Sequence, residues 1–133
     1  MKKIFILFCL LALNGCMLIA PNQKEKLMNK DLTLIVDSRL SQEHLPFLFI
    51  KADGRVSGST GCNRLLGQAT FGNTGELVFK SLATTKMFCF FEGDMEEYFV
   101  NGLNNTAYYF INDNIVYFLD SNQDKIFALK IRD

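Results

Sequence analysis

Short apolar segments separated by turn residues recur along most of this 133-residue chain. They are rich in β-branched and aromatic residues and are bounded by Gly, Asn, Asp, Ser or Pro, a pattern typical of strands joined by turns. The expected strands cover residues 31–36, 46–51, 55–59, 66–71, 76–79, 107–111, 115–119 and 125–131. Asp53-Gly54 indicates a tight hairpin, because Gly adopts positive φ without strain. The chain is therefore expected to form a small antiparallel sheet.

One segment has the period of a helix instead of a strand. Asp94 is a favourable N-cap, and Glu97 stands at the capping-box position. The apolar side chains that follow share one face of the helix: Met95, Tyr98, Phe99 and Leu103. We expect one main α-helix at about residues 94–104, with this face buried against the sheet. The predicted fold class is α+β, with the sheet curled into a partly open barrel that avoids bare edges.

The N-terminus has the features of a secretory signal. Lys2 and Lys3 precede an apolar run over residues 4–13, and Asn14-Gly15-Cys16 follows. A basic start, a short apolar run and a small residue before the cleavage point are typical of such signals. The alternative is an uncleaved membrane helix that continues to Ala20. The interruption at residues 14 and 15 favours cleavage, because a spanning helix needs roughly 20 apolar residues.

Residues 13–16 resemble the lipobox of bacterial lipoproteins. The resemblance implies cleavage before Cys16 and acylation of Cys16 with palmitate or a similar chain, which attaches the protein to a membrane. Met17 stands where an inner-membrane retention signal would carry Asp, so the resemblance implies the outer membrane, facing the periplasm. The expected organisation is a signal peptide at 1–15, a lipid-anchored tether at 16–30 and one domain at 31–133.

Four cysteines are present, and two of them remain for the folded domain. Cys9 lies in the signal and Cys16 would carry lipid. Cys62 and Cys89 are then an even pair in an oxidising compartment, which favours a disulfide. A zinc site or a catalytic thiol is the alternative, but His44 is the only histidine available as a ligand or base. We therefore expect no metal and no cofactor.

Polar residues beside the two cysteines are the candidate binding patch. Asn63, Arg64, Thr85 and Lys86 would be gathered into one region by a disulfide. They would either bind a partner or small anion, or serve the structure by capping turns, pairing with carboxylates and satisfying backbone groups. The structural interpretation is favoured, because polar residues at bends usually bond to the backbone.

The rest of the sequence argues against enzymes and nucleic-acid binders. The full chain has zero net charge, and loss of Lys2 and Lys3 leaves an acidic excess, so it lacks the basic footprint of a nucleic-acid binder. It carries no Gly-rich phosphate loop, nucleophile elbow or metal triad. A non-catalytic protein is expected.

Three blocks together resemble the META domain family and the HslJ-like envelope proteins within it. They are residues 53–64, which contain Gly61-Cys62-Asn63-Arg64, residues 82–89, which contain Thr85-Lys86-Met87-Phe88-Cys89, and the closing segment 114–129. The resemblance implies a barrel-like domain with one helix. It also implies an envelope lipoprotein linked to heat-shock and antibiotic (novobiocin-type) stress, acting through envelope protein partners without catalysis. The fold is similar to that of a type III secretion pilotin, which suggests an alternative role as carrier of a hydrophobic ligand or acyl chain.

Overall fold

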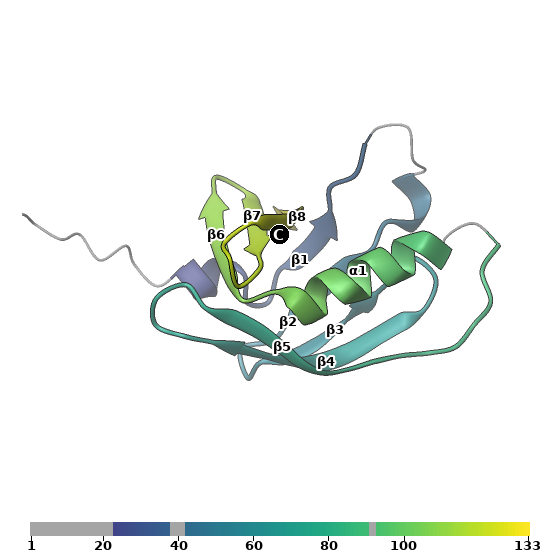
Figure 1. The fold of residues 1–133 in the computed structure, drawn as a ribbon, viewed down its shortest axis with the longest axis horizontal. Coiled ribbons are helices and arrows are strands. Elements are labelled where there is room, and N and C mark those ends of the chain that lie inside the picture. The colour runs from purple at the N-terminus through teal and green to yellow at the C-terminus, as the bar shows by residue number, and fades with distance from the viewer. Residues whose placement is uncertain (1–22, 38–41, 91–92) are drawn as a thin grey trace, which may run out of the picture.

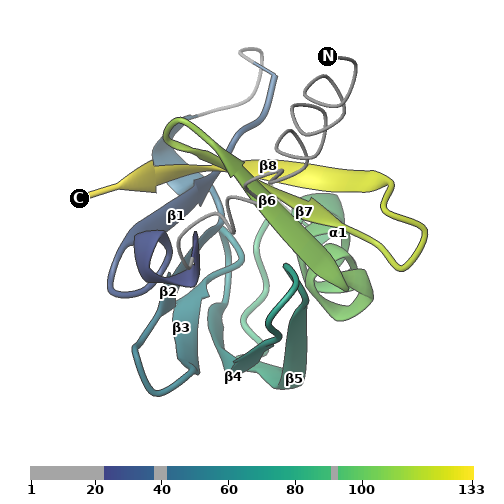
Figure 2. The ribbon, with the colours of Figure 1, turned by 90° about the vertical axis from the view of Figure 1, so that its left-hand side faces the viewer.

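The computed structural model of the chain describes residues 23–37, 42–90 and 93–133. Eight strands form one antiparallel sheet in the order β5-β4-β3-β2-β1-β8-β7-β6 (Figures 1 and 2). The elements are β1 (Asp31–Leu34), β2 (Phe47–Ile50), β3 (Arg55–Ser59), β4 (Arg64–Phe71), β5 (Leu77–Thr84), α1 (Gly93–Asn105), β6 (Tyr108–Asn112), β7 (Ile115–Leu119) and β8 (Lys125–Arg132). Two short 3-10 turns, η1 (Gln23–Lys26) and η2 (Gln42–His44), complete the described elements.

The sheet curls into a half-barrel whose edge strands approach each other at one end. There the Leu77 amide donates to the Ala107 carbonyl at 3.0 Å, and the Tyr109 amide donates to the Gly75 carbonyl at 2.9 Å. Helix α1 connects β5 to β6 and crosses the open side of the half-barrel (Figure 1). The expected partly open barrel with one main helix is therefore confirmed for the described residues.

The interior of the half-barrel is filled by side chains from the sheet and from α1. The Phe99 ring of α1 stacks on Phe127 of β8 with centroids 5.5 Å apart. Phe118 of β7 lies between Phe127 and Phe79, at 5.7 and 5.6 Å. The alternation of strand side chains explains this arrangement, since every second residue of a strand points inward.

Strand β5 continues to Thr84, beyond the predicted end at Phe79. The register between β4 and β5 shifts between Leu66 and Gln68, and Ser81 has a positive φ of 53°. A bulge of this kind places one extra residue on one strand and breaks the alternation of apolar and polar positions. Because the alternation is interrupted there, the sequence pattern did not indicate the second half of the strand.

Residues 23–30, which the sequence assigns to the tether, pack against the sheet. The Leu27 side chain is fully buried in the core, and the Asn29 amide donates to the Ile50 carbonyl at 2.7 Å. A single buried leucine in a polar segment produces no periodic signal. The predicted signal peptide and Cys16 lie outside the described residues, and no described helix has the length and apolar character needed to cross a membrane.

Gly102 allows α1 to lie close against β8, and its replacement should weaken this contact. A Cβ atom at position 102 would lie 2.1 Å from Cε1 of Phe127 and 3.0 Å from Cγ2 of Ile126. We expect Gly102→Ala to lower the free energy of unfolding by about 1–2 kcal/mol, because overpacking outweighs the better helix propensity of Ala. Urea denaturation measures the change. Asn104→Ala, on an exposed position of the same helix, is the control, and equal stability of both variants would contradict the prediction.

Candidate functional site

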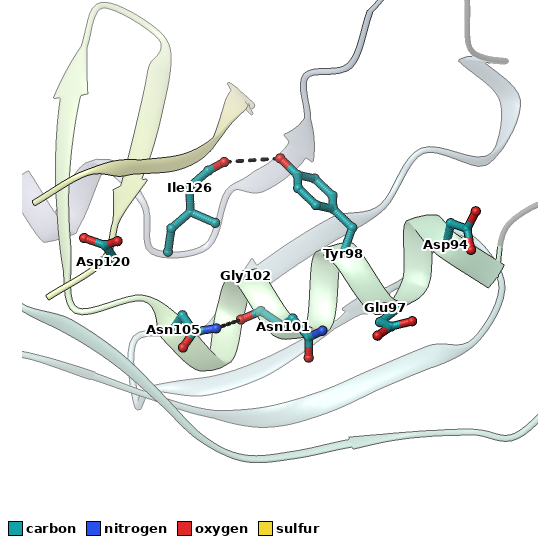
Figure 3. Close-up of a pocket in the computed structure, with 8 residues that line it drawn as sticks. All are labelled: Asp94, Glu97, Tyr98, Asn101, Gly102, Asn105, Asp120 and Ile126. Carbon is teal, nitrogen blue, oxygen red and sulfur yellow. Dashed lines mark hydrogen bonds between the residues drawn. The ribbon is translucent and has the colours of Figure 1, made fainter. Parts of the chain in front are cut away.

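A groove lies between α1 and the segment that joins β7 to β8 (Figure 3). Its volume is about 520 Å³, and its lining residues are Asp94, Glu97, Tyr98, Asn101, Gly102, Asn105, Asp120 and Ile126. The Tyr98 hydroxyl donates to the Ile126 carbonyl at 3.2 Å, and the Asp120 carboxylate accepts from the amide of Asn122 at 2.9 Å. These polar groups stabilise the helix contact and a turn.

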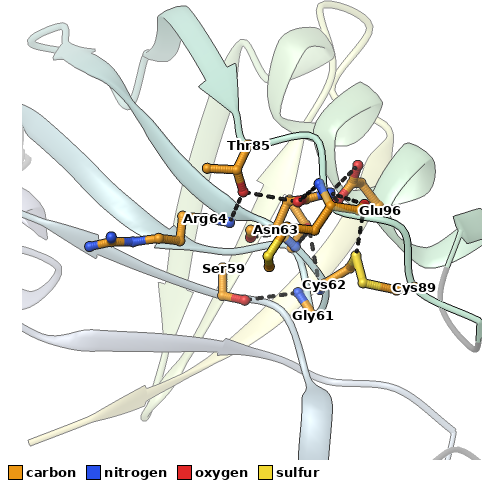
Figure 4. The surroundings of a disulfide bond; sticks show 10 residues. Ser59, Gly61, Cys62, Asn63, Arg64, Thr85, Cys89 and Glu96 are labelled. Carbon is orange, nitrogen blue, oxygen red and sulfur yellow. Dashed lines mark hydrogen bonds between the residues drawn. A yellow bond between two sulfur atoms is a disulfide. The ribbon is translucent and has the colours of Figure 1, made fainter.

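The structure contains the Cys62–Cys89 disulfide, with the two Cα atoms 5.9 Å apart (Figure 4). Cys62 lies in the turn between β3 and β4, and Cys89 lies in the segment between β5 and α1. The crosslink therefore joins two connections that lie far apart in the sequence and fixes them at one end of the half-barrel.

Asn63 is the centre of a hydrogen-bond network beside the disulfide. Its side chain is 3% exposed. The Oδ1 atom accepts from the Met87 amide at 2.7 Å and from the Thr85 hydroxyl at 2.9 Å. The Nδ2 group donates to the Met87 carbonyl at 3.3 Å and to the Glu96 carboxylate at 2.9 Å. One buried amide thus ties the β3–β4 turn to the segment before α1 and to α1 itself.

Thr60 completes the network from the other side of the turn. Its buried hydroxyl donates to the Glu96 carboxylate and accepts from the Asn63 amide at 2.9 Å. Buried backbone amides need such partners, because an unpaired one loses its bond to water without replacement. Gly61 has φ near 93°, which fits a glycine in this turn. We call Thr60, Asn63, Thr85, Glu96 and the disulfide the brace.

The four residues of the predicted patch do not form one surface. Asn63 is buried, and the Thr85 hydroxyl, besides contacting Asn63, accepts from the Arg64 amide at 3.0 Å. Arg64 and Lys86 are exposed, and the Arg64 side chain extends away from the brace (Figure 4). The geometry therefore favours the structural interpretation for Asn63 and Thr85.

Sequence reasoning missed two members of the brace. Thr60 lies within the motif block at residues 53–64, but nothing in the sequence distinguishes it from the neighbouring polar residues. Glu96 lies outside the apolar stripe of the helix, and it contacts Asn63 across 33 positions of sequence. No local spacing encodes a contact of that separation.

The brace also presents an apolar projection that the sequence analysis had not singled out. Phe88 and Phe90 flank Cys89, and their rings meet edge to face with centroids 5.1 Å apart. The two side chains are 83% and 85% exposed, and Met87 beside them is 60% exposed. We call Met87, Phe88 and Phe90 the knob. An apolar run of this kind ordinarily predicts burial, so its exposure is decided by the tertiary structure.

Shifted pKa values among the described residues lie away from the brace. Hydrogen bonds from the backbone and side chain of Arg55 lower the pKa of Asp53 in the β2–β3 turn. Burial raises the pKa of the Tyr109 phenol. The described residues also contain no group of three or more His, Cys, Asp or Glu side chains able to hold a metal ion.

A model of the META domain family matches residues 31–131. No curated protein shows a significant sequence match to the chain. Among solved structures, the NMR structure of a protein from Burkholderia xenovorans is 20% identical in sequence and superposes with a TM-score of 0.66. The match covers 82% of this chain and 86% of that one. A second NMR structure is 24% identical with a TM-score of 0.60, over 81% and 92%. A DUF4847 family protein from Bacteroides vulgatus is 14% identical with a TM-score of 0.61, over 84% and 96%. These structures share the fold.

Proposed function

Because the chain belongs to the META domain family, we propose that it is a non-catalytic lipoprotein of the bacterial cell envelope. In this proposal it supports tolerance of heat-shock or antibiotic (novobiocin-type) stress through contacts with envelope proteins. The observation that carries the proposal is the brace. Three of its polar side chains, those of Thr60, Asn63 and Thr85, come from the motifs most typical of the family resemblance, and they bond to one another, to Glu96 and to the backbone.

A catalytic site needs reactive groups that a substrate can reach. Asn63 and Thr60 are buried, and the carboxylate of Glu96 accepts hydrogen bonds from both. Residues occupied in this way hold two loops in place, and the loops present an exposed surface. That arrangement supports a protein that works through contacts.

The envelope location follows from the lipobox-like segment that ends at Cys16. The disulfide fits this location, because crosslinks persist in oxidising compartments. The intact mass of the protein extracted from membranes should exceed that of the mature chain by the mass of the acyl groups on Cys16. An unmodified mature chain would contradict the anchor.

A deletion strain provides the test of the stress role. Loss of the chain should increase sensitivity to heat and to novobiocin, and the wild-type gene should restore growth. Cys16→Ala should fail to restore it, because the protein lacks its lipid anchor, whereas Arg64→Ala should succeed. Unchanged sensitivity of the deletion strain would contradict the stress role, and full restoration by Cys16→Ala would show that anchoring is dispensable.

The alternative function, a carrier of a hydrophobic ligand, receives no support from the interior. Phe99, Phe118 and Phe127 pack against one another in the core of the half-barrel, where an acyl chain would compete with them for space. A native mass spectrum of gently extracted protein distinguishes the two functions, since a carrier would retain a noncovalent lipid.

A further inference from the structure

The knob is the most exposed apolar feature among the described residues. Phe88 and Phe90 expose more than four-fifths of their surface, and their mutual ring contact makes them one apolar body. Isolated exposed apolar residues are common in soluble proteins and need no explanation. Two adjacent Phe rings beside an exposed Met expose a larger continuous apolar area, which is typical of an interaction site.

The knob is held in its exposed position by the brace. Cys89, between the two Phe residues, is bonded to Cys62. Both the amide and the carbonyl of Met87 are bound by the Asn63 side chain, at 2.7 and 3.3 Å. A loop fixed by a crosslink and a buried amide cannot easily fold its apolar side chains inward. The exposure of the knob is therefore a consequence of the fold.

The position of the knob relative to the N-terminus restricts what it can reach. Figure 1 shows the knob segment at the right end of the longest axis and η1, drawn in purple, at the left end. About seven residues separate Cys16 from Gln23, so an anchor on Cys16 keeps Gln23 within roughly 25 Å of the bilayer. The anchored domain therefore stays close to the bilayer, so the effective concentration of lipid around the domain is high.

We infer that the knob inserts into the same bilayer that carries the lipid anchor. The inference rests on the anchored state in the proposed function. A lipid surface accepts a convex apolar projection of any shape, whereas a protein partner would need a matching pocket for both rings. With the anchor at one end of the domain and the knob at the other, the long axis of the domain lies along the membrane.

Charge contributes little to this attachment. Lys86 precedes the knob in the sequence, and Asp94 and Glu97 follow it on the first turns of α1, so charges of both signs stand on its two sides in the sequence. Insertion driven by apolar area is insensitive to salt, unlike attraction to anionic lipids. Binding should therefore persist on neutral phosphatidylcholine vesicles and in high salt.

The chain contains no Trp, so Phe88→Trp places the only tryptophan of the variant in the knob, and its emission can be followed apart from that of the tyrosines. The test uses the mature chain with Cys16→Ala, which cannot be acylated and so reports knob insertion independently of the anchor. On phosphatidylcholine vesicles the emission should shift to shorter wavelength and be quenched by brominated acyl chains. Phe110→Trp, on the outer face of β6 and 45% exposed, is the matched control and should be unaffected.

Removal of the rings should weaken vesicle binding by about tenfold for each Phe replaced by Ser. Both positions are exposed, and urea denaturation confirms that the variants fold. The inference is overturned if Phe88→Trp emission does not change with vesicles, if the Phe110→Trp control is quenched equally, or if high salt abolishes binding. The first outcome would direct the search to a protein partner. Failure of the proposed anchor would appear separately, as an unmodified Cys16 in the intact mass.

Discussion

Loss of the Cys62–Cys89 disulfide should lower the free energy of unfolding by about 3.5 kcal/mol, as expected from chain entropy for a separation of 27 residues. The crosslink restricts the unfolded chain, so most of the effect arises there. It also fixes the segment that carries Phe88 and Phe90, so reduction should loosen the knob as well as destabilise the domain.

Urea denaturation of the mature Cys16→Ala chain with and without reductant measures this effect. Cys62 and Cys89 are then the only cysteines, since Cys9 leaves with the predicted signal peptide. The Cys62→Ser/Cys89→Ser variant is the matched control and should resemble the reduced wild type in either condition. Identical unfolding of the oxidised and reduced forms would mean that the crosslink adds no stability.

Asn63→Ala should lower the free energy of unfolding by about 2–4 kcal/mol. The substitution removes the hydrogen bond to the Glu96 carboxylate, which is a charge-assisted interaction, and those to Thr85 and Met87. It also leaves polar atoms in the brace without their partner, and that loss costs more than the mean value of a hydrogen bond.

Arg64→Ala is the natural control, because Arg64 is adjacent in sequence and exposed, and its effect should stay within about 0.5 kcal/mol. A double-mutant cycle with Glu96→Ala should give a coupling energy of about 1 kcal/mol or more, since the two side chains are in contact. Equal effects of Asn63→Ala and Arg64→Ala would contradict the role assigned to Asn63.

The type and order of the elements could be predicted from local patterns. The helix stripe containing Phe99 and Leu103 repeats at helical spacing, and both side chains are buried. The disulfide could be predicted because only Cys62 and Cys89 remain after the signal and the lipobox-like cysteine are accounted for. In contrast, the bulge at Ser81 and the packing of Leu27 have no periodic signal, so neither the end of β5 nor the burial of Leu27 could be predicted.

By itself, the sequence determined the fold class, the main helix and the pairing of the two cysteines. Hydrophobic period and turn chemistry depend on neighbouring residues, and the number of cysteines can be counted directly. Only the tertiary structure decided that Asn63 is buried against Glu96 and that Phe88 and Phe90 project into solvent. Side-chain type does not specify such outcomes. They depend on which distant segments the curled sheet and the crosslink bring together.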